Sequence, residues 1–368
     1  MLIYLLALLD VKLALHLILL KDFKSWVIPL DTVKVILSKP DLAGENRYRP
    51  ASGTLLSARA KSLDSKQVSL VKQVVIQQDL SLLNAENYTE QALLLDSSDE
   101  YAAYLALKAK LNESQLREFQ YQLLLQRSQL NATYHNPLTE IPKSPIESHA
   151  SMKVAVTGGY AADSSFGELQ LRPAYHSLSD KQIGFPQGSQ ILFMDTKLRF
   201  DKSNNFDLEK FTALDIVSAF PRNAFIKTTA WEFMTGIENQ NIGLGSSRNE
   251  KLVWDSYFGL GSAVGGQTWL LAGFMDLRSK YNPDFDNSYA LGLAPHLRAL
   301  VNLSSELTIE TEYFHSEYLA GDEHTASRAD LRLRWFPEAN HSIDIYGSRV
   351  SEYEDFYTEL GLSVSKYF

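Results

Sequence analysis

The sequence predicts an α+β protein in which an N-terminal helical segment precedes an antiparallel transmembrane β-barrel of about 12 strands. Three observations lead to this fold. Residues 1–150 hold 10 aromatic residues and 2 glycines, whereas residues 151–368 hold 31 and 17. The apolar period changes from about 3.6 to 2 after residue 150. The last strand-like segment runs to the terminal Phe368 with apolar side chains on one face.

Composition excludes several classes of function. The 368 residues contain no cysteine, so disulfides, thiolate metal ligands and thiol nucleophiles are excluded. The net charge of −9 argues against nucleic acid as a partner, because nucleic-acid binders neutralise phosphates with clustered Lys and Arg. A mean hydropathy of −0.18 excludes a bundle of transmembrane helices.

The first apolar run, Met1 to Leu20, resembles a targeting segment but fits one poorly. Asp10, Lys12 and His16 interrupt the run, and no small-residue cleavage site follows it. We therefore expect a buried helix within a domain covering residues 1–40, and no signal peptide in this chain.

Residues 41–135 are predicted to form a helical connector. Asp64 precedes Val68, Val71, Val74 and Val75, whose spacings of three and four predict an amphipathic helix. Such stripes are typical of core faces, and no cofactor motif lies on them. A linker at 136–150 follows, with three prolines in ten residues.

Residues 151–368 form the predicted barrel, because its segments alternate apolar and polar side chains over about ten residues, longer than usual soluble strands. A soluble β-sandwich is the alternative interpretation. An even number of segments favours a closed barrel, which leaves no unpaired edge in hydrocarbon. The expected strands are 153–162, 165–175, 188–200, 207–219, 223–238, 251–264, 267–280, 287–302, 305–319, 325–336, 340–350 and 355–368.

Loop lengths and the final strand also favour a membrane barrel. If the chain enters from the periplasm, the turn at Pro221-Arg222 and three others are short and periplasmic, and the outer loops are longer. The stretch His176 to Gln187 breaks this rule as a long inner loop. Phe368 ends a strand that resembles the signature by which barrel-assembly machinery recognises outer-membrane proteins, although Lys366 departs from it. We therefore expect that machinery and outer-membrane lipid as partners, with a periplasmic N-terminal segment.

The inward faces of the predicted strands carry charges of both signs. Glu310 and Glu312 are expected to face Arg332 and Arg334 on the next strand, and His296 and Arg298 project from the strand before. A charge-paired lumen that fills a narrow barrel is the favoured interpretation, and a polar conduit is the alternative.

Catalytic and metal motifs are weak. The run Tyr175 to Asp180 contains Ser, His and Asp, but a catalytic triad is defined by spatial geometry and the run is too compressed to indicate one. A metal site from His176, Asp180 and His296 lacks a diagnostic spacing. No phosphate loop or dinucleotide motif is present, so no cofactor and no metal is predicted.

Several segments nevertheless resemble bacterial envelope proteins that carry an Lnb-like (lipoprotein transacylase-type) N-terminal periplasmic domain. They cover nearly the whole chain in the family's order. The matching segments are Tyr4–Val11, Trp26–Val33, Arg47–Ala51, Arg172–His176, Asp180, Gly188, Gln190-Ile191, Asp215–Ser218 and Pro221-Arg222. The resemblance implies a periplasmic acyltransferase or amidase domain, a helical segment and a C-terminal barrel. It marks Arg172, Tyr175, His176, Asp180, Gly188 and Asp215 as residues of unknown role.

One departure from this family changes what the resemblance implies. The family has an Asn-Cys pair just before its first matching helix, and here Leu2 stands where the cysteine would be. No catalytic residue is therefore carried over. We expect an N-terminally truncated member, with lipoprotein or cell-wall substrates only in full-length relatives.

One main function and two alternatives follow as hypotheses. The first is a noncatalytic barrel that anchors a periplasmic enzyme-like domain in complete relatives. The alternatives are a lipid-active hydrolase that uses His176, Asp180 and a serine, and a small-solute channel.

Overall fold

The computed structural model describes residues 51–83, 87–108, 113–132, 148–162, 164–201, 206–242, 250–353 and 355–368. The expected domain remnant at 1–40 lies outside them, as does most of the expected linker at 136–150. The chain divides into two compact units. One comprises residues 1–45, 143–221 and 229–368, and the other comprises 46–142 together with 222–228.

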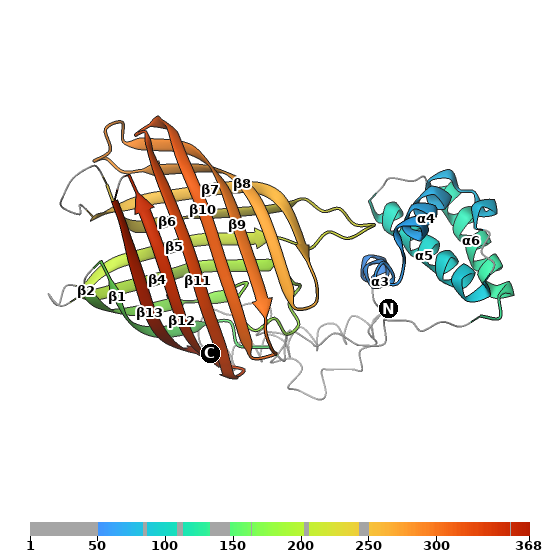
Figure 1. Ribbon diagram of the computed structural model, residues 1–368, viewed down its shortest axis with the longest axis horizontal. Helices are drawn as coiled ribbons and strands as arrows, with labels where there is room; N and C mark the ends of the chain where they lie inside the picture. Colours follow the sequence, from blue (N-terminus) through green and yellow to red (C-terminus); the bar gives the residue numbers. More distant parts are fainter. Residues whose placement is uncertain are drawn as a thin grey trace, which may run out of the picture. The chain divides into compact units, whose positions relative to one another are not determined.

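In the described part of the helical unit there are four α-helices and one 3-10 turn (Figure 1). They are α3 (Ser52–Arg59), α4 (Ser65–Gln77), η1 (Leu80–Leu82), α5 (Tyr88–Leu107) and α6 (Glu113–Gln129). The helix predicted after Asp64 is present as α4, and Asp64 caps it: its Oδ1 accepts from the Gln67 backbone N–H at 2.8 Å, and the Gln67 side chain accepts from the Asp64 N–H at 2.9 Å. Among the described residues, no helix is long and apolar enough to cross a membrane.

The core of the helical unit includes a segment from the other half of the sequence. Val71, Val74 and Leu95 are almost completely buried, and Phe225 packs in the same cluster. The Phe225 ring centroid lies 5.3 Å from that of Tyr101. Asn223 shapes this segment, because its Oδ1 accepts from the N–H groups of Phe225 and Ile226 at 2.9 and 2.8 Å. The connection between two barrel strands is therefore part of the helical core.

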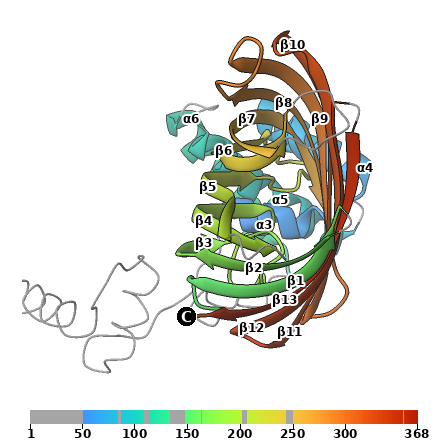
Figure 2. The ribbon, with the colours of Figure 1, turned by 90° about the vertical axis from the view of Figure 1, so that its left-hand side faces the viewer.

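The second unit is a closed antiparallel barrel (Figures 1 and 2). β3 continues β2 after a break at Pro173, so the thirteen labelled strands form twelve barrel strands. The sheet closes because β2 pairs with both β1 and β4. The strands are β1 (Lys153–Ala161), β2 (Ser164–Arg172), β3 (Ala174–His176), β4 (Ser189–Asp201), β5 (Phe206–Ser218), β6 (Ala230–Asn241), β7 (Glu250–Gly265), β8 (Trp269–Tyr281), β9 (Tyr289–Asn302), β10 (Leu307–Gly321), β11 (His324–Glu338), β12 (His341–Glu352) and β13 (Asp355–Tyr367). The predicted closed barrel with an N-terminal helical segment is confirmed.

The barrel is apolar outside and polar inside. On β9 the outward Leu293 and Leu297 are 46% and 51% exposed, whereas the inward His296 is fully buried. Similar alternation runs along the other strands, because successive side chains point to opposite faces. Phe368 lies outside with Leu360, Leu362 and Val364, and its backbone N–H donates to the Met152 carbonyl at 2.8 Å. The barrel thus presents an apolar surface that suits lipid.

Two sequence predictions about connections are wrong. The expected strand 223–238 begins at Ala230, and the short turn at Pro221-Arg222 is part of a longer connection between β5 and β6. The reason is physical: Phe225 is buried in the core of the helices and residues 222–228 belong to the helical unit, so they do not extend the strand. No local pattern distinguishes this segment from a strand start.

Candidate functional site: the barrel lumen

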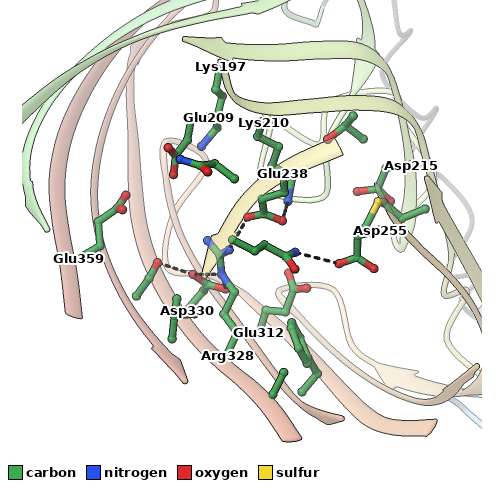
Figure 3. Close-up of a pocket in the computed structure, with 18 of the residues that line it drawn as sticks. Lys197, Glu209, Lys210, Asp215, Glu238, Asp255, Glu312, Arg328, Asp330 and Glu359 are labelled. Atoms are coloured by element: carbon green, nitrogen blue, oxygen red, sulfur yellow. Dashed lines mark hydrogen bonds and ion pairs between the residues drawn. The ribbon is translucent and has the colours of Figure 1, made fainter. Parts of the chain in front are cut away.

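A cavity of about 650 Å³ occupies the barrel lumen (Figure 3). Its lining includes Asn241, Ser351 and Asp355 at one end of the barrel and Ser177 and Ser179 towards the other. We call the end where β1 begins and β13 finishes the terminal end. The expected filled lumen is therefore only half correct, because charges pair across the lumen and a cavity remains between them.

The plug loop, defined as residues 177–188 between β3 and β4, packs inside the lumen towards the terminal end. Leu178 is 3% exposed and packs against inward side chains of five strands or strand ends. These side chains are Val217, Ala219, Ala230, Ala263, Leu270, Ala272, Phe274 and Leu300. The predicted long inner loop at His176 to Gln187 thus folds into the barrel instead of projecting from it.

Asp180 fixes the plug loop to the opposite part of the wall. Its carboxylate accepts from Arg172 Nη2 at 2.6 Å, Arg334 Nη1 at 2.9 Å and the Tyr367 hydroxyl at 2.7 Å. The backbone N–H of Ser177 donates to it at 2.9 Å. Complete burial would raise the pKa of Asp180, but Arg172, His149 and Arg334 outweigh that effect and hold the pKa well below its usual range.

Two histidines lie beside Asp180. His149 Nε2 and His176 Nδ1 are 3.0 Å apart in a hydrogen bond, and burial lowers the pKa of His149. The His176 ring stacks on Phe185 of the plug loop at 4.0 Å, and its Nε2 contacts Gln182. His149 was not anticipated, because it lies 27 residues before His176 and no local pattern connects them.

Neither hydrolytic nor metal chemistry is supported at the plug loop. Both ring nitrogens of His176 contact His149 or Gln182, and the Ser177 and Ser179 hydroxyls contact each other at 3.3 Å. No serine therefore bonds His176 among the described residues, as a triad requires. His149, His176 and Asp180 could together reach a cation, but Arg172 and Arg334 both bond the one carboxylate and would oppose it.

His296 belongs to a second buried cluster, so the hypothesis that joined it to His176 and Asp180 is wrong. Its Nδ1 lies 2.7 Å from Glu232 and 2.9 Å from Asp276, and its Nε2 lies 3.0 Å from Glu312. Arg298 binds Glu232 and Glu312 at 2.8 and 2.9 Å. The cluster is a network of ion pairs within the wall of the lumen.

The expected pairing of β10 with β11 is half correct. Glu310 lies opposite Arg332, and their side chains are 3.9 Å apart. Glu312 lies opposite Asp330 and turns to β9 instead, while Arg334 binds Asp344 at 2.7 Å. The register of the two strands decides which side chains pair. Residues on one face are two apart, so Arg332 opposite Glu310 places Asp330 opposite Glu312.

The other motif residues lie apart from Asp180. Asp215 on β5 lines the cavity and accepts from Gln190 Nε2 at 2.9 Å. Tyr175 is the middle residue of β3, opposite Leu192 of β4, with a φ of 78°, and is half-buried. Gly188 closes the plug loop with a φ of +83°, and a Cβ there would lie 2.2 Å from the Ala219 carbonyl oxygen.

A closed barrel of twelve strands with an apolar outside and a charged lumen is an outer-membrane β-barrel. The chain belongs to the family described as "Domain of unknown function (DUF7840)", whose model matches residues 142–367. A second model, "Domain of unknown function (DUF7842)", matches residues 46–137. None of the curated proteins matches this chain.

Solved structures similar to the barrel include three outer-membrane proteins. The KdgM porin in complex with disordered oligogalacturonate has 11% identity and a TM-score of 0.34, over 59% of this chain and 99% of that chain. The NanC porin has 9% identity and a TM-score of 0.39, over 58% and 100%. An outer-membrane channel from Pseudomonas putida F1 has 12% identity and a TM-score of 0.38, over 64% and 100%. Similarity at this level carries no information on solute or partner.

Proposed function

We propose that the barrel is a small-solute channel of the outer membrane that the plug loop holds closed at its terminal end. The observation that carries this proposal is the lumen cavity of about 650 Å³, which extends from the end opposite the termini to Ser177 and Ser179. Eleven basic and eleven acidic residues line it, so its surface stays hydrated. A lumen built only to hold the barrel together would be filled by side chains.

The plug loop is suited to act as a gate. Leu178 and Asp180 bind it to different parts of the wall. Outer-membrane barrels have short turns on the periplasmic side, and on this basis we assign the terminal end to the periplasm. The gate would then control passage from the cavity into that compartment.

Planar-bilayer conductance tests the channel. We would compare the full chain with a variant in which residues 178–187 are replaced by a short Gly-Ser turn. The expected result is small or rare conductance steps in the unaltered chain and larger, lasting steps in the variant. Two folded proteins, verified by heat-modifiable gel mobility, that both fail to conduct would exclude a channel.

A second candidate function, anchoring, is favoured by Phe225. Because residues 222–228 lie in the helical core, the barrel holds that unit through its own strand connection as well as through the chain. The barrel would then tether the helical unit and, in longer relatives, the enzyme-like domain that residues 1–40 resemble. Proteolysis tests this: replacing 222–228 by a Gly-Ser turn should expose the helical unit to cleavage while the barrel stays resistant. Unchanged cleavage would exclude the tether.

A further inference from the structure

The cavity is lined by equal numbers of basic and acidic side chains, but the two kinds differ in how many are ion-paired. Each of the eleven basic side chains that line the cavity lies within 4.0 Å of a carboxylate. Four lining carboxylates have no such cation among the described residues. These are Asp195, Asp215, Asp255 and Asp355. The charge left for a solute is therefore negative.

Asp215 and Asp255 form the most developed part of this surface, which we call the acidic wall. Figure 3 shows both of them at one side of the cavity, and they come from β5 and β7. Asp215 accepts from Gln190 at 2.9 Å, and Asp255 accepts from Gln240 at 3.4 Å. Both partners are neutral amides, which orient a carboxylate without cancelling its charge.

The second oxygen of each carboxylate has no hydrogen-bond partner. Oδ1 of Asp215 and Oδ1 of Asp255 are both buried and unpaired, and the whole Asp255 residue is 6% exposed. Gly236 lies opposite Asp255 on β6 and puts no side chain in front of it. A buried carboxylate oxygen without a hydrogen-bond partner is costly, so one that persists in a membrane protein points to a functional site.

We infer that the acidic wall is a subsite for a positively charged group, so that the solutes of this barrel are cations or carry an ammonium group. The inference rests on the proposed channel and names the class of solute that it takes. Lumen arginines and lysines, already bound to carboxylates, repel such a solute less than their number suggests. Neutral and anionic solutes gain nothing at the wall.

Binding of methylammonium to the refolded full chain tests the subsite without requiring conductance. Line broadening of the methylammonium NMR signal would be measured for the unaltered protein and for Asp215→Asn, Asp255→Asn and the double variant. The double variant should bind at least about tenfold more weakly, as expected for losing charge partners in a buried site. The matched control, Lys210→Gln with Glu238→Gln, removes one cation and one anion from the same cavity and leaves Arg328, the other partner of Glu238, bound to Asp330, so it should change affinity less than about twofold.

Acetate and potassium complete the test. Acetate binding as strongly as methylammonium, or unchanged affinity in the double variant, would overturn the inference. Competition by K⁺ at equal concentration would assign the wall to cations in general, and resistance to K⁺ would assign it to ammonium-bearing solutes. Methylammonium binding by the unaltered chain that is lost in the double variant, together with a plug-loop variant that does not conduct, would reject the channel and keep the subsite. Heat-modifiable mobility confirms that each variant is folded.

Discussion

The helical unit and the barrel bury opposite kinds of side chain. In the helices, Val71 and Leu95 are inside, and the exposed surface is largely polar. In the barrel, Asp276 and His296 are fully buried, and the outward Leu277 is 59% exposed. The comparison teaches that burial follows the surrounding solvent: water selects an apolar interior, whereas lipid allows a charged one if each charge is paired.

The largest effect is expected where an ion-paired interior loses one partner. Arg334→Ala leaves Asp180 and Asp344 with less compensation inside the barrel, at a cost of about 3–5 kcal/mol. Urea unfolding in micelles measures it. Arg349→Ala, on the same sheet but facing outward, is the control and should change stability little; equal losses would mean that lumen pairing does not hold the barrel.

The apolar interior should respond through packing instead. Phe225→Ala creates a cavity among the helices, and we expect about 3–5 kcal/mol less stability for the helical unit. Hydrogen exchange should rise in α4 and α5 while the strands stay protected. Faster exchange in the strands alone would contradict the assignment of Phe225 to the helical core.

A charge that is tolerated inside the barrel should be destabilising on its outer face. Leu277→Arg, near the middle of β8, should cost about 2–4 kcal/mol in lipid vesicles. Leu277→Ala separates lost bulk from added charge. Folding yields in vesicles that are the same for both variants would indicate that this face does not contact hydrocarbon.

The smallest effect concerns a local signal that does not depend on lipid. Asp64→Ala removes the capping oxygen of α4 and should lower stability by about 1 kcal/mol. Asp64→Asn keeps an acceptor and should retain most of it. Thermal unfolding followed by helical circular dichroism distinguishes the two variants.

The strands, their faces and the final outward row up to Phe368 were predictable, because they follow from a period of two within each strand. The helix that follows Asp64 was predictable for a similar local reason. The contacts inside the lumen were less predictable. Glu310 pairs with Arg332 as expected, but Glu312 pairs with His296. Alternation predicts only which face a side chain is on, whereas the strand register decides which residue lies opposite it.

The site itself depends on contacts between distant parts of the chain. His149, Leu178 and Asp180 act through residues that lie up to 187 positions away, as Tyr367 does for Asp180. Short-range patterns contain no record of such contacts. The resemblance to envelope proteins had marked Arg172, His176, Asp180 and Asp215, and the first three lie together at the plug loop.

The position of Phe225 also bears on how such genes change. A deletion that removed residues 46–137 would leave Phe225 and Ile226 without the helices that cover them. A duplication that moved the helices elsewhere would leave their core incomplete. The helical region 46–137 and the barrel region 142–367 are therefore expected to be gained and lost together in evolution.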